Sequence, residues 1–122
     1  MSGLCLMSGA AAAMLLLDTF TLSWTHTVEK TLWEEDWRIV GGQLVLAEAR
    51  VQGSGAGMEP GPGAKLDQGW WRWRPDRQPL EKLVLARSGV AADHRLCLRP
   101  GACRALSDLI EGEGEITLQP CG

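Results

Sequence analysis

Large and small side chains alternate strictly along the first half of the chain. The alternation runs from Thr19 to Val28 and again from Trp33 to Val51, on both sides of Gly41-Gly42. Successive side chains of a β-strand point to opposite faces, so this period of two predicts strands with one buried face. The two glycines favour a two-residue hairpin, which needs positive φ at both positions. The sequence therefore predicts strands over Thr19–Val28, Trp33–Val40 and Gln43–Val51.

Shorter apolar runs separated by turn signals occupy the second half of the chain. Glycine and proline are too frequent in Gly53–Gly63 for a regular element, which predicts a long shaped loop. Ala105–Ile110 suits either one helical turn or a strand. Many short strands separated by turns are typical of an all-β domain, either a small antiparallel β-sandwich or a barrel. The further strands expected are Trp70–Arg74, Leu83–Arg87, Arg95–Leu98 and Ile116–Leu118.

The N-terminal segment has a different composition from the rest of the chain. The first 17 residues carry no charged side chain, and residues 4–17 are apolar or small throughout. This length suits the hydrophobic region of a signal peptide and is short for a membrane span of about 20 residues. We expect residues 1–18 to form an apolar helix that acts as a signal peptide or membrane anchor, and residues 19–122 to form a single β domain.

This segment also bears on the cellular location. A basic region before it and an A-x-A cleavage site after it are both missing, so a buried N-terminal helix of a cytosolic domain is the alternative. Under the first interpretation, the protein is periplasmic or lies on the outer face of the cytoplasmic membrane, which its N-terminal segment contacts. The net charge of -3 and pI of about 5.3 do not suggest a nucleic-acid partner.

The cysteines support an exported protein. Cys97 and Cys103 flank Arg99-Pro100-Gly101, and a Pro-Gly turn there can bring their Cα atoms within disulfide range. We expect a Cys97–Cys103 disulfide, with Cys121 free or competing for one of the two partners. The alternative is that all three thiols are reduced. The chain lacks a CxxC pair or a histidine cluster of the kind that binds zinc, and nothing in it implies a cofactor.

Several acidic and histidine side chains stand where the alternation predicts apolar ones. With a two-residue hairpin at Gly41-Gly42, Glu35 lies directly opposite Glu48, and two like charges so placed repel each other. If that face is buried, one carboxyl is protonated, or a cation or Arg50 neutralises the pair. Both a small cation or amine site and a salt-bridged network that fixes the register fit this pattern. The candidate cluster is His26, Glu29, Glu35 and Glu48, with Glu59 if the glycine-rich loop folds back.

Tryptophan and arginine alternate in residues 70–74. Trp70 and Trp71 are candidate binding residues, because tryptophan and arginine are enriched at interface hot spots. The alternative is a core strand with Trp71 and Trp73 inside and the arginines outside. Catalysis has weaker support: no Ser/His/Asp or Cys/His arrangement has a defined spacing, and the glycine-rich loop lacks the G-K-[ST] of a phosphate loop. We therefore expect a protein that is not an enzyme.

Three blocks of sequence carry a family resemblance. HTVEKTLWEEDW (His26 to Trp37), EARVQGSGAGMEP (Glu48 to Pro60) and GWWRWRP (Gly69 to Pro75) resemble the domain-of-unknown-function family numbered 1850. The resemblance implies no established activity and assigns no catalytic residues. Members are small bacterial proteins typically encoded beside TRAP-type solute transporters with a binding protein of the TAXI class. It thus implies an accessory outside the cytoplasmic membrane, with transporter subunits as partners; the alternative is a small cation- or ligand-binding module.

Overall fold

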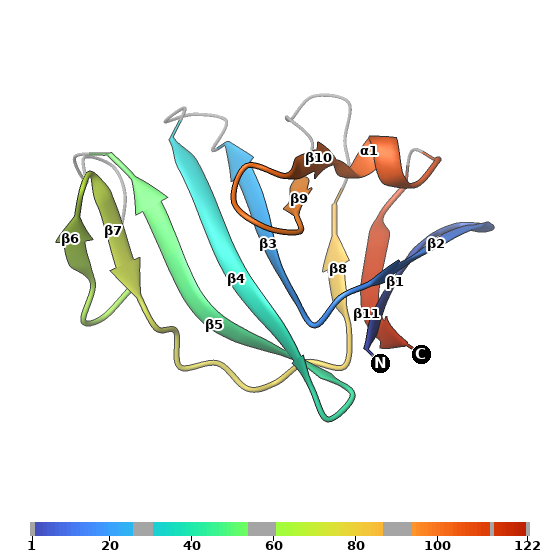
Figure 1. Ribbon diagram of the computed structural model, residues 1–122, viewed down its shortest axis with the longest axis horizontal. Coiled ribbons are helices and arrows are strands. Elements are labelled where there is room, and N and C mark those ends of the chain that lie inside the picture. Colours follow the sequence, from blue (N-terminus) through green and yellow to red (C-terminus); the bar gives the residue numbers. More distant parts are fainter. Residues whose placement is uncertain (1, 26–30, 54–60, 87–93, 113, 122) are drawn as a thin grey trace.

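The protein folds into two antiparallel β-sheets and one helical turn (Figure 1). The computed structural model describes residues 2–25, 31–53, 61–86, 94–112 and 114–121. The elements are β1 (Gly3–Ser8), β2 (Ala11–Leu16), β3 (Thr19–Thr25), β4 (Leu32–Val40), β5 (Gln43–Gln52), β6 (Lys65–Asp67), β7 (Trp70–Trp73), β8 (Leu83–Leu85), β9 (Arg95–Cys97), β10 (Cys103–Ala105), α1 (Leu106–Leu109) and β11 (Ile116–Cys121). The predicted antiparallel β fold is confirmed, and residues 105–110 supply the helical turn.

The smaller sheet has four strands in the order β2-β1-β11-β8, and the larger sheet has seven in the order β10-β9-β3-β4-β5-β7-β6. One apolar core lies between them. Its buried side chains come from both sheets, because alternate residues of each strand point inward. The smaller sheet contributes Leu4, Leu6, Ile116 and Leu118, and the larger sheet contributes Phe20, Leu22, Trp37, Leu44, Leu46 and Leu96.

The predicted N-terminal helix is wrong, because this segment forms the β1–β2 hairpin. β1 lies inside the smaller sheet between β2 and β11, and Leu4 and Leu6 are fully buried. Gly9 takes a positive φ of 58° at the turn. The helix was predicted because a continuous apolar run does not distinguish a buried strand from a helix. Cleavage after residue 18 would remove both strands. In the described ranges, no helix is long and apolar enough to cross a membrane.

Two disulfides cross-link the chain. Cys97 and Cys103 face each other across β9 and β10 and are bonded, as predicted. Cys121 is bonded to Cys5, with Cα atoms 5.8 Å apart, so the prediction that Cys121 is free or competing is wrong. The partner was missed because Cys5 was assigned to a leader outside the domain. This second bridge joins neighbouring strands β1 and β11 whose cysteines are 116 residues apart in the sequence.

A β-bulge changes the register of the β4–β5 hairpin. From Gly41-Gly42 as far as Trp37, which lies opposite Leu46, the register is the predicted one. Beyond that point β5 has one extra residue, Ala47, so Asp36 rather than Glu35 lies opposite Glu48. A bulge of this kind reverses the inside–outside alternation of the residues that follow it. The predicted Glu35–Glu48 pair is therefore wrong, because Glu35 lies opposite Ala49.

We predict that the two disulfides stabilise the protein unequally. Replacing Cys5 and Cys121 with serine should lower the free energy of unfolding by about 4–5 kcal/mol, because that bridge closes a very long loop in the unfolded chain. The matched control, serine at Cys97 and Cys103, opens a short loop and should cost about 2 kcal/mol. Urea unfolding without reductant measures both values. Equal losses would contradict the prediction.

Candidate functional site

The bulge of β5 lies on the floor of a groove on the outer face of the larger sheet, the face turned away from the shared core. The β9–β10 hairpin, closed by its disulfide, forms one wall of this groove. β3, β4 and β5 contribute polar side chains to its floor. Bulges redirect side chains, and this one turns Glu48 and Arg50 outward. The groove is lined by Thr19, Thr21, Asp36, Arg38, Ala47, Glu48, Arg50, Arg74, Leu98, Arg99 and Pro100, with parts of Phe20 and Trp37.

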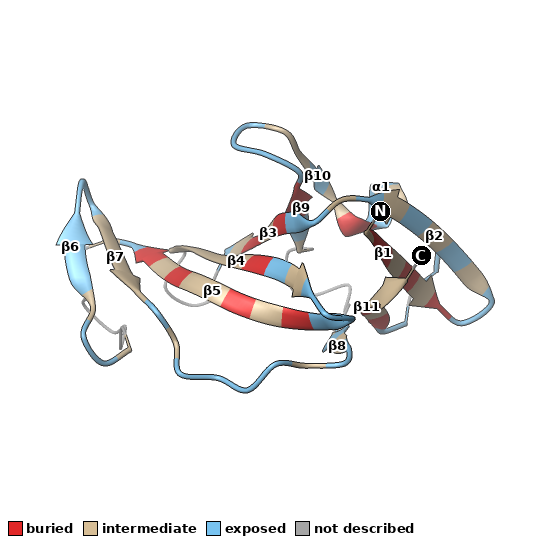
Figure 2. Ribbon diagram, turned by 60° about the horizontal axis from the view of Figure 1, so that its bottom comes forward, coloured by how far each residue is buried: buried red, intermediate tan, exposed pale blue. Residues whose placement is uncertain are grey.

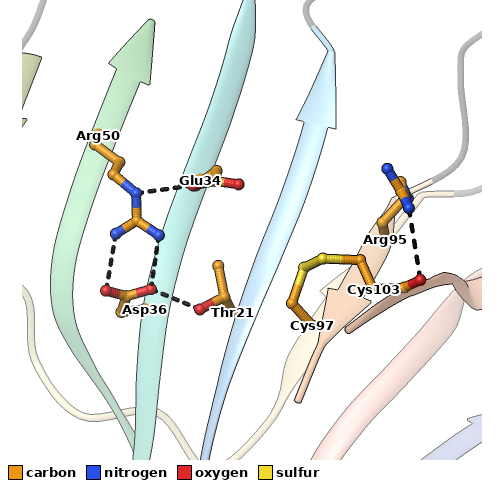
Figure 3. Close-up of a disulfide and its surroundings, with 7 residues drawn as sticks. All are labelled: Thr21, Glu34, Asp36, Arg50, Arg95, Cys97 and Cys103. Atoms are coloured by element: carbon orange, nitrogen blue, oxygen red, sulfur yellow. Dashed lines mark hydrogen bonds and ion pairs between the residues drawn. A yellow bond between two sulfur atoms is a disulfide. The ribbon is translucent and has the colours of Figure 1, made fainter. Parts of the chain in front are cut away.

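Arg50 is the centre of a network of charged side chains in the groove (Figure 3). Its guanidinium binds both carboxylate oxygens of Asp36, at 2.8 and 3.2 Å. It also donates to Glu34 at 2.8 Å and to Glu48 at 2.9 Å. Thr21 Oγ1 donates to Asp36 at 2.6 Å. Paired hydrogen bonds between a guanidinium and a carboxylate are strong and directional, so the network fixes three strands relative to one another.

The network shifts the pKa values of Asp36 and Arg50. Burial opposes ionisation of Asp36, but hydrogen bonds from Arg50 and Thr21 outweigh it and lower the pKa of that carboxyl. Burial opposes the charged form of Arg50, but hydrogen bonds to Asp36 and Glu34 and the charges of these carboxylates outweigh it and raise the pKa of Arg50 above its usual range. Arg72 extends the network through a 3.2 Å bond to Glu48, and the ring of Trp70 lies 5.9 Å from the Arg50 guanidinium. The counter-charge for these carboxylates is therefore arginine.

Three other arginines around the groove keep their charge available. Arg38, Arg74 and Arg99 are exposed, and none forms an ion pair with a residue in the described part of the chain. Together with Arg50 they give the groove lining four arginines against two carboxylates, in a chain whose net charge is -3. Guanidinium groups bind carboxylates and phosphates in a planar, two-point geometry. The groove is thus suited to binding an anionic group.

Glu35 lies on the opposite face of the sheet, among tryptophans. Trp37 Nε1 donates a hydrogen bond to Glu35 at 3.2 Å. Burial raises the pKa of Glu35, while the Trp37 bond and the positive charge of Arg77 partly offset this effect. Trp33 on the same strand stacks against Trp24 and meets Trp73 edge to face, with ring centroids 6.3 and 6.1 Å apart. This face is therefore an apolar, aromatic layer with one carboxyl in it.

The predicted carboxylate–histidine cluster is not assembled by the described residues. Glu35 and Glu48 lie on opposite faces of the sheet, and His26, Glu29 and Glu59 lie outside the described residues. Within the described ranges, no group of three or more acidic, histidine or cysteine side chains could hold a metal ion.

The two candidate tryptophans also separate. Val51 lies opposite Trp71, so Trp71 is on the aromatic face, whereas Trp70 lies on the groove face beside Arg50.

The sequence analysis missed the Arg50–Asp36 pair, although the chain contains a signal for it. The even positions of β5 change from apolar to charged along the strand, because Leu44 and Leu46 are followed by Glu48 and Arg50, while Ala49 and Val51 at odd positions stay apolar. Such a change of phase within one strand indicates an inserted residue. Placing the bulge at residues 47–48 would have put Arg50 and Asp36 on one face.

We predict that Arg50 is the residue on which the network depends. Arg50→Gln should lower the free energy of unfolding by about 2–3 kcal/mol at neutral pH, because three carboxylates lose their shared counter-charge. The loss should shrink as the pH falls below 3.8, the ordinary pKa of Asp36, because Asp36 becomes protonated there. Arg38→Gln, on the same strand pair but without an ion pair, should change stability by less than about 0.5 kcal/mol. Urea unfolding at several pH values measures this, and equal effects would contradict it.

We predict the opposite sign for Glu35. The pKa of Glu35 in the folded state lies above the ordinary value of 4.5, so folding favours the protonated form. Stability therefore falls as the pH rises from 4.5 through the raised pKa. Glu35→Gln keeps an acceptor for Trp37 without the charge. It should be more stable than the natural chain at neutral pH, and the difference should vanish below pH 4.5. Glu34→Gln is the matched control, because Glu34 pairs with Arg50 and its loss should not stabilise the protein. A Glu35→Gln variant less stable at neutral pH would refute the prediction.

Comparison with known proteins identifies the family. The family described as "Domain of unknown function (DUF1850)" matches residues 20–106. This range runs from β3 to the first residue of α1 and includes the bulge, the Arg50 network and the disulfide-closed hairpin. No curated protein and no solved structure matches the chain. Because the match covers well over half of the sequence, the chain belongs to the DUF1850 family of domains of unknown function.

Proposed function

We propose that this protein is a non-enzymatic accessory of a TRAP-type solute uptake system of the TAXI class, and that it acts outside the cytoplasmic membrane by binding a transporter subunit. The link to the transporter comes from the family resemblance. The observation that carries the proposal is the arginine-lined groove. Its three available guanidinium groups suit an acidic surface or a carboxylate group on a partner protein.

The groove has the rigidity that a recognition surface needs. On the floor of the groove, Arg50 of β5 bonds to Glu34 and Asp36 of β4, and Thr21 of β3 also bonds to Asp36. The Cys97–Cys103 disulfide closes the β9–β10 hairpin, whose turn carries Arg99. Groups held in place before binding lose less conformational entropy when a partner arrives. A pre-formed surface of this kind supports a role in binding.

The two disulfides support a location outside the cytoplasm. Structural disulfides form and persist in oxidising compartments such as the bacterial periplasm and are rare in the cytosol. All four cysteines of this chain form disulfides, as expected for a protein in an oxidising compartment. In the periplasm the groove could meet the solute-binding protein and the outer surfaces of the membrane subunits.

Co-purification from bacterial envelopes tests the proposal. The tagged protein, expressed with the subunits of a TAXI-class transporter, should retain at least one of them in low salt and lose it as salt rises, because exposed arginines contribute charge that salt screens. Reversing Arg38, Arg74 and Arg99 to glutamate should abolish retention. Arg104→Glu is the matched control, because Arg104 is exposed but lies outside the groove.

The location is tested in the same cells. The protein should be recovered in the periplasmic or membrane fraction with both disulfides formed. Recovery in the cytosol with reduced thiols, or retention of the subunits by the triple glutamate variant, would overturn the proposal. Circular dichroism of each variant separates loss of binding from loss of fold.

A further inference from the structure

The edge strands of the two sheets differ in length and charge. β6, β8 and β10 are three residues each; β6 carries Lys65 and Asp67, and β10 carries Arg104. Short, charged edges prevent unwanted pairing with other strands. β8 is uncharged but short, whereas β2 has six residues, Ala-Ala-Ala-Met-Leu-Leu, and no charge or proline. In the described part of the chain, β1 pairs with one edge of β2 and no strand pairs with the other.

The free edge of β2 presents unpaired backbone groups at alternate residues. Leu17 N–H donates to Ser2 C=O at 3.1 Å, and β2 continues the same antiparallel register with β1. Hydrogen-bonded positions alternate along an antiparallel pair, so the odd-numbered residues of β2 bond to β1. The N–H and C=O groups of Ala12, Met14 and Leu16 therefore point away from the sheet, where an added strand can bond to them.

The side chains on this edge are apolar and exposed. Met14 is 50% exposed and Leu16 67% exposed, the highest value among the large hydrophobic side chains described as exposed. Figure 2 shows exposed bands alternating with partly buried ones along β2, so the exposed positions form one side of the strand. Met14 and Leu16 do not contribute to the core. The residues of β2 that pack against the core are Ala11, Ala13 and Leu15, on the other side of the strand.

The sequence of β2 is complementary to itself when it is reversed. Its first half is small and its second half is large. In an antiparallel pair with Ala13 opposite its own copy, Ala12 lies opposite Met14, and Ala11 opposite Leu15. Met14 and Leu15 then each meet an alanine. This register also makes Ala12 and Met14, whose backbone groups point outward, a hydrogen-bonded pair.

We propose that β2 pairs antiparallel with β2 of a second copy of this chain, with Ala12 opposite Met14 of that copy, so that the two smaller sheets form one continuous sheet across a two-fold axis. Such an interface is isologous, because each copy contributes the same strand. Backbone hydrogen bonds hold the pair, and Met14 and Leu16 lose part of their exposure to water to the neighbouring strand. The proposal does not depend on the arginine-lined groove.

Sedimentation analysis of the purified chain with intact disulfides provides the first test. The protein should be a dimer at micromolar concentration. Met14→Lys should raise the dimer dissociation constant about tenfold or more, because it places a charge on the pairing edge. Val84→Lys is the matched control: Val84 is 46% exposed on the edge strand β8, and its replacement should leave the dimer unchanged. A monomer at all concentrations, or equal weakening by both variants, overturns the proposal.

Cross-linking tests the register. All native cysteines are in disulfides, so an introduced cysteine is the free thiol. A mixture of Ala12→Cys and Met14→Cys chains should form disulfide-linked heterodimers, since directly opposed residues lie within bonding range. Each variant alone should cross-link at least several-fold less. Efficient cross-linking of Met14→Cys alone, or a monomer that instead floats with phospholipid vesicles through Met14 and Leu16, overturns the proposal.

Discussion

The extra residue in β5 determines which side chains meet on each face of the larger sheet. On the side of Ala47 nearer the Gly41-Gly42 turn, Trp37 and Leu46 point into the core shared with the smaller sheet. After Ala47 in the sequence, the odd-numbered residues of β5 take the inner face, so Ala49 and Val51 continue the apolar face while Arg50 points outward. The long β4–β5 hairpin can therefore contribute to the shared core and to the aromatic layer without exposing either. A hairpin without the bulge would place Arg50 among tryptophans.

The two faces of the larger sheet shift the pKa values of Asp36 and Glu35 in opposite directions. On the groove face, one guanidinium bonds to Glu34, Asp36 and Glu48, and it lowers the pKa of Asp36. On the aromatic face, Glu35 has a single indole donor, so burial shifts it toward its neutral form. A charge becomes tolerable in a partly buried site only when it is paired and hydrogen-bonded. The groove consequently has charged side chains whose positions are fixed by hydrogen bonds.

The local part of the fold could be predicted from the sequence, and the parts that depend on distant contacts could not. The alternation located β3, β4 and β5, the glycine pair fixed the turn, and the spacing of Cys97 and Cys103 identified their bridge. The N-terminal strands were missed because hydrophobicity without a period is compatible with strand, helix and leader alike. The bridge from Cys5 to Cys121 was missed for the same reason. The Arg50 network was missed because one inserted residue exchanges the two faces.

The bridge between β1 and β11 has a consequence for the order of folding. β1 lies between β2 and β11, and β11 follows all the other described strands in the sequence. The larger sheet can assemble mostly from strands close in sequence, whereas the smaller sheet must wait for its central partner. Contacts between such distant segments form slowly because a long loop has to close first. Leu4 and Leu6 therefore gain their neighbouring strand β11 only when this long loop closes, and the smaller sheet is incomplete until then.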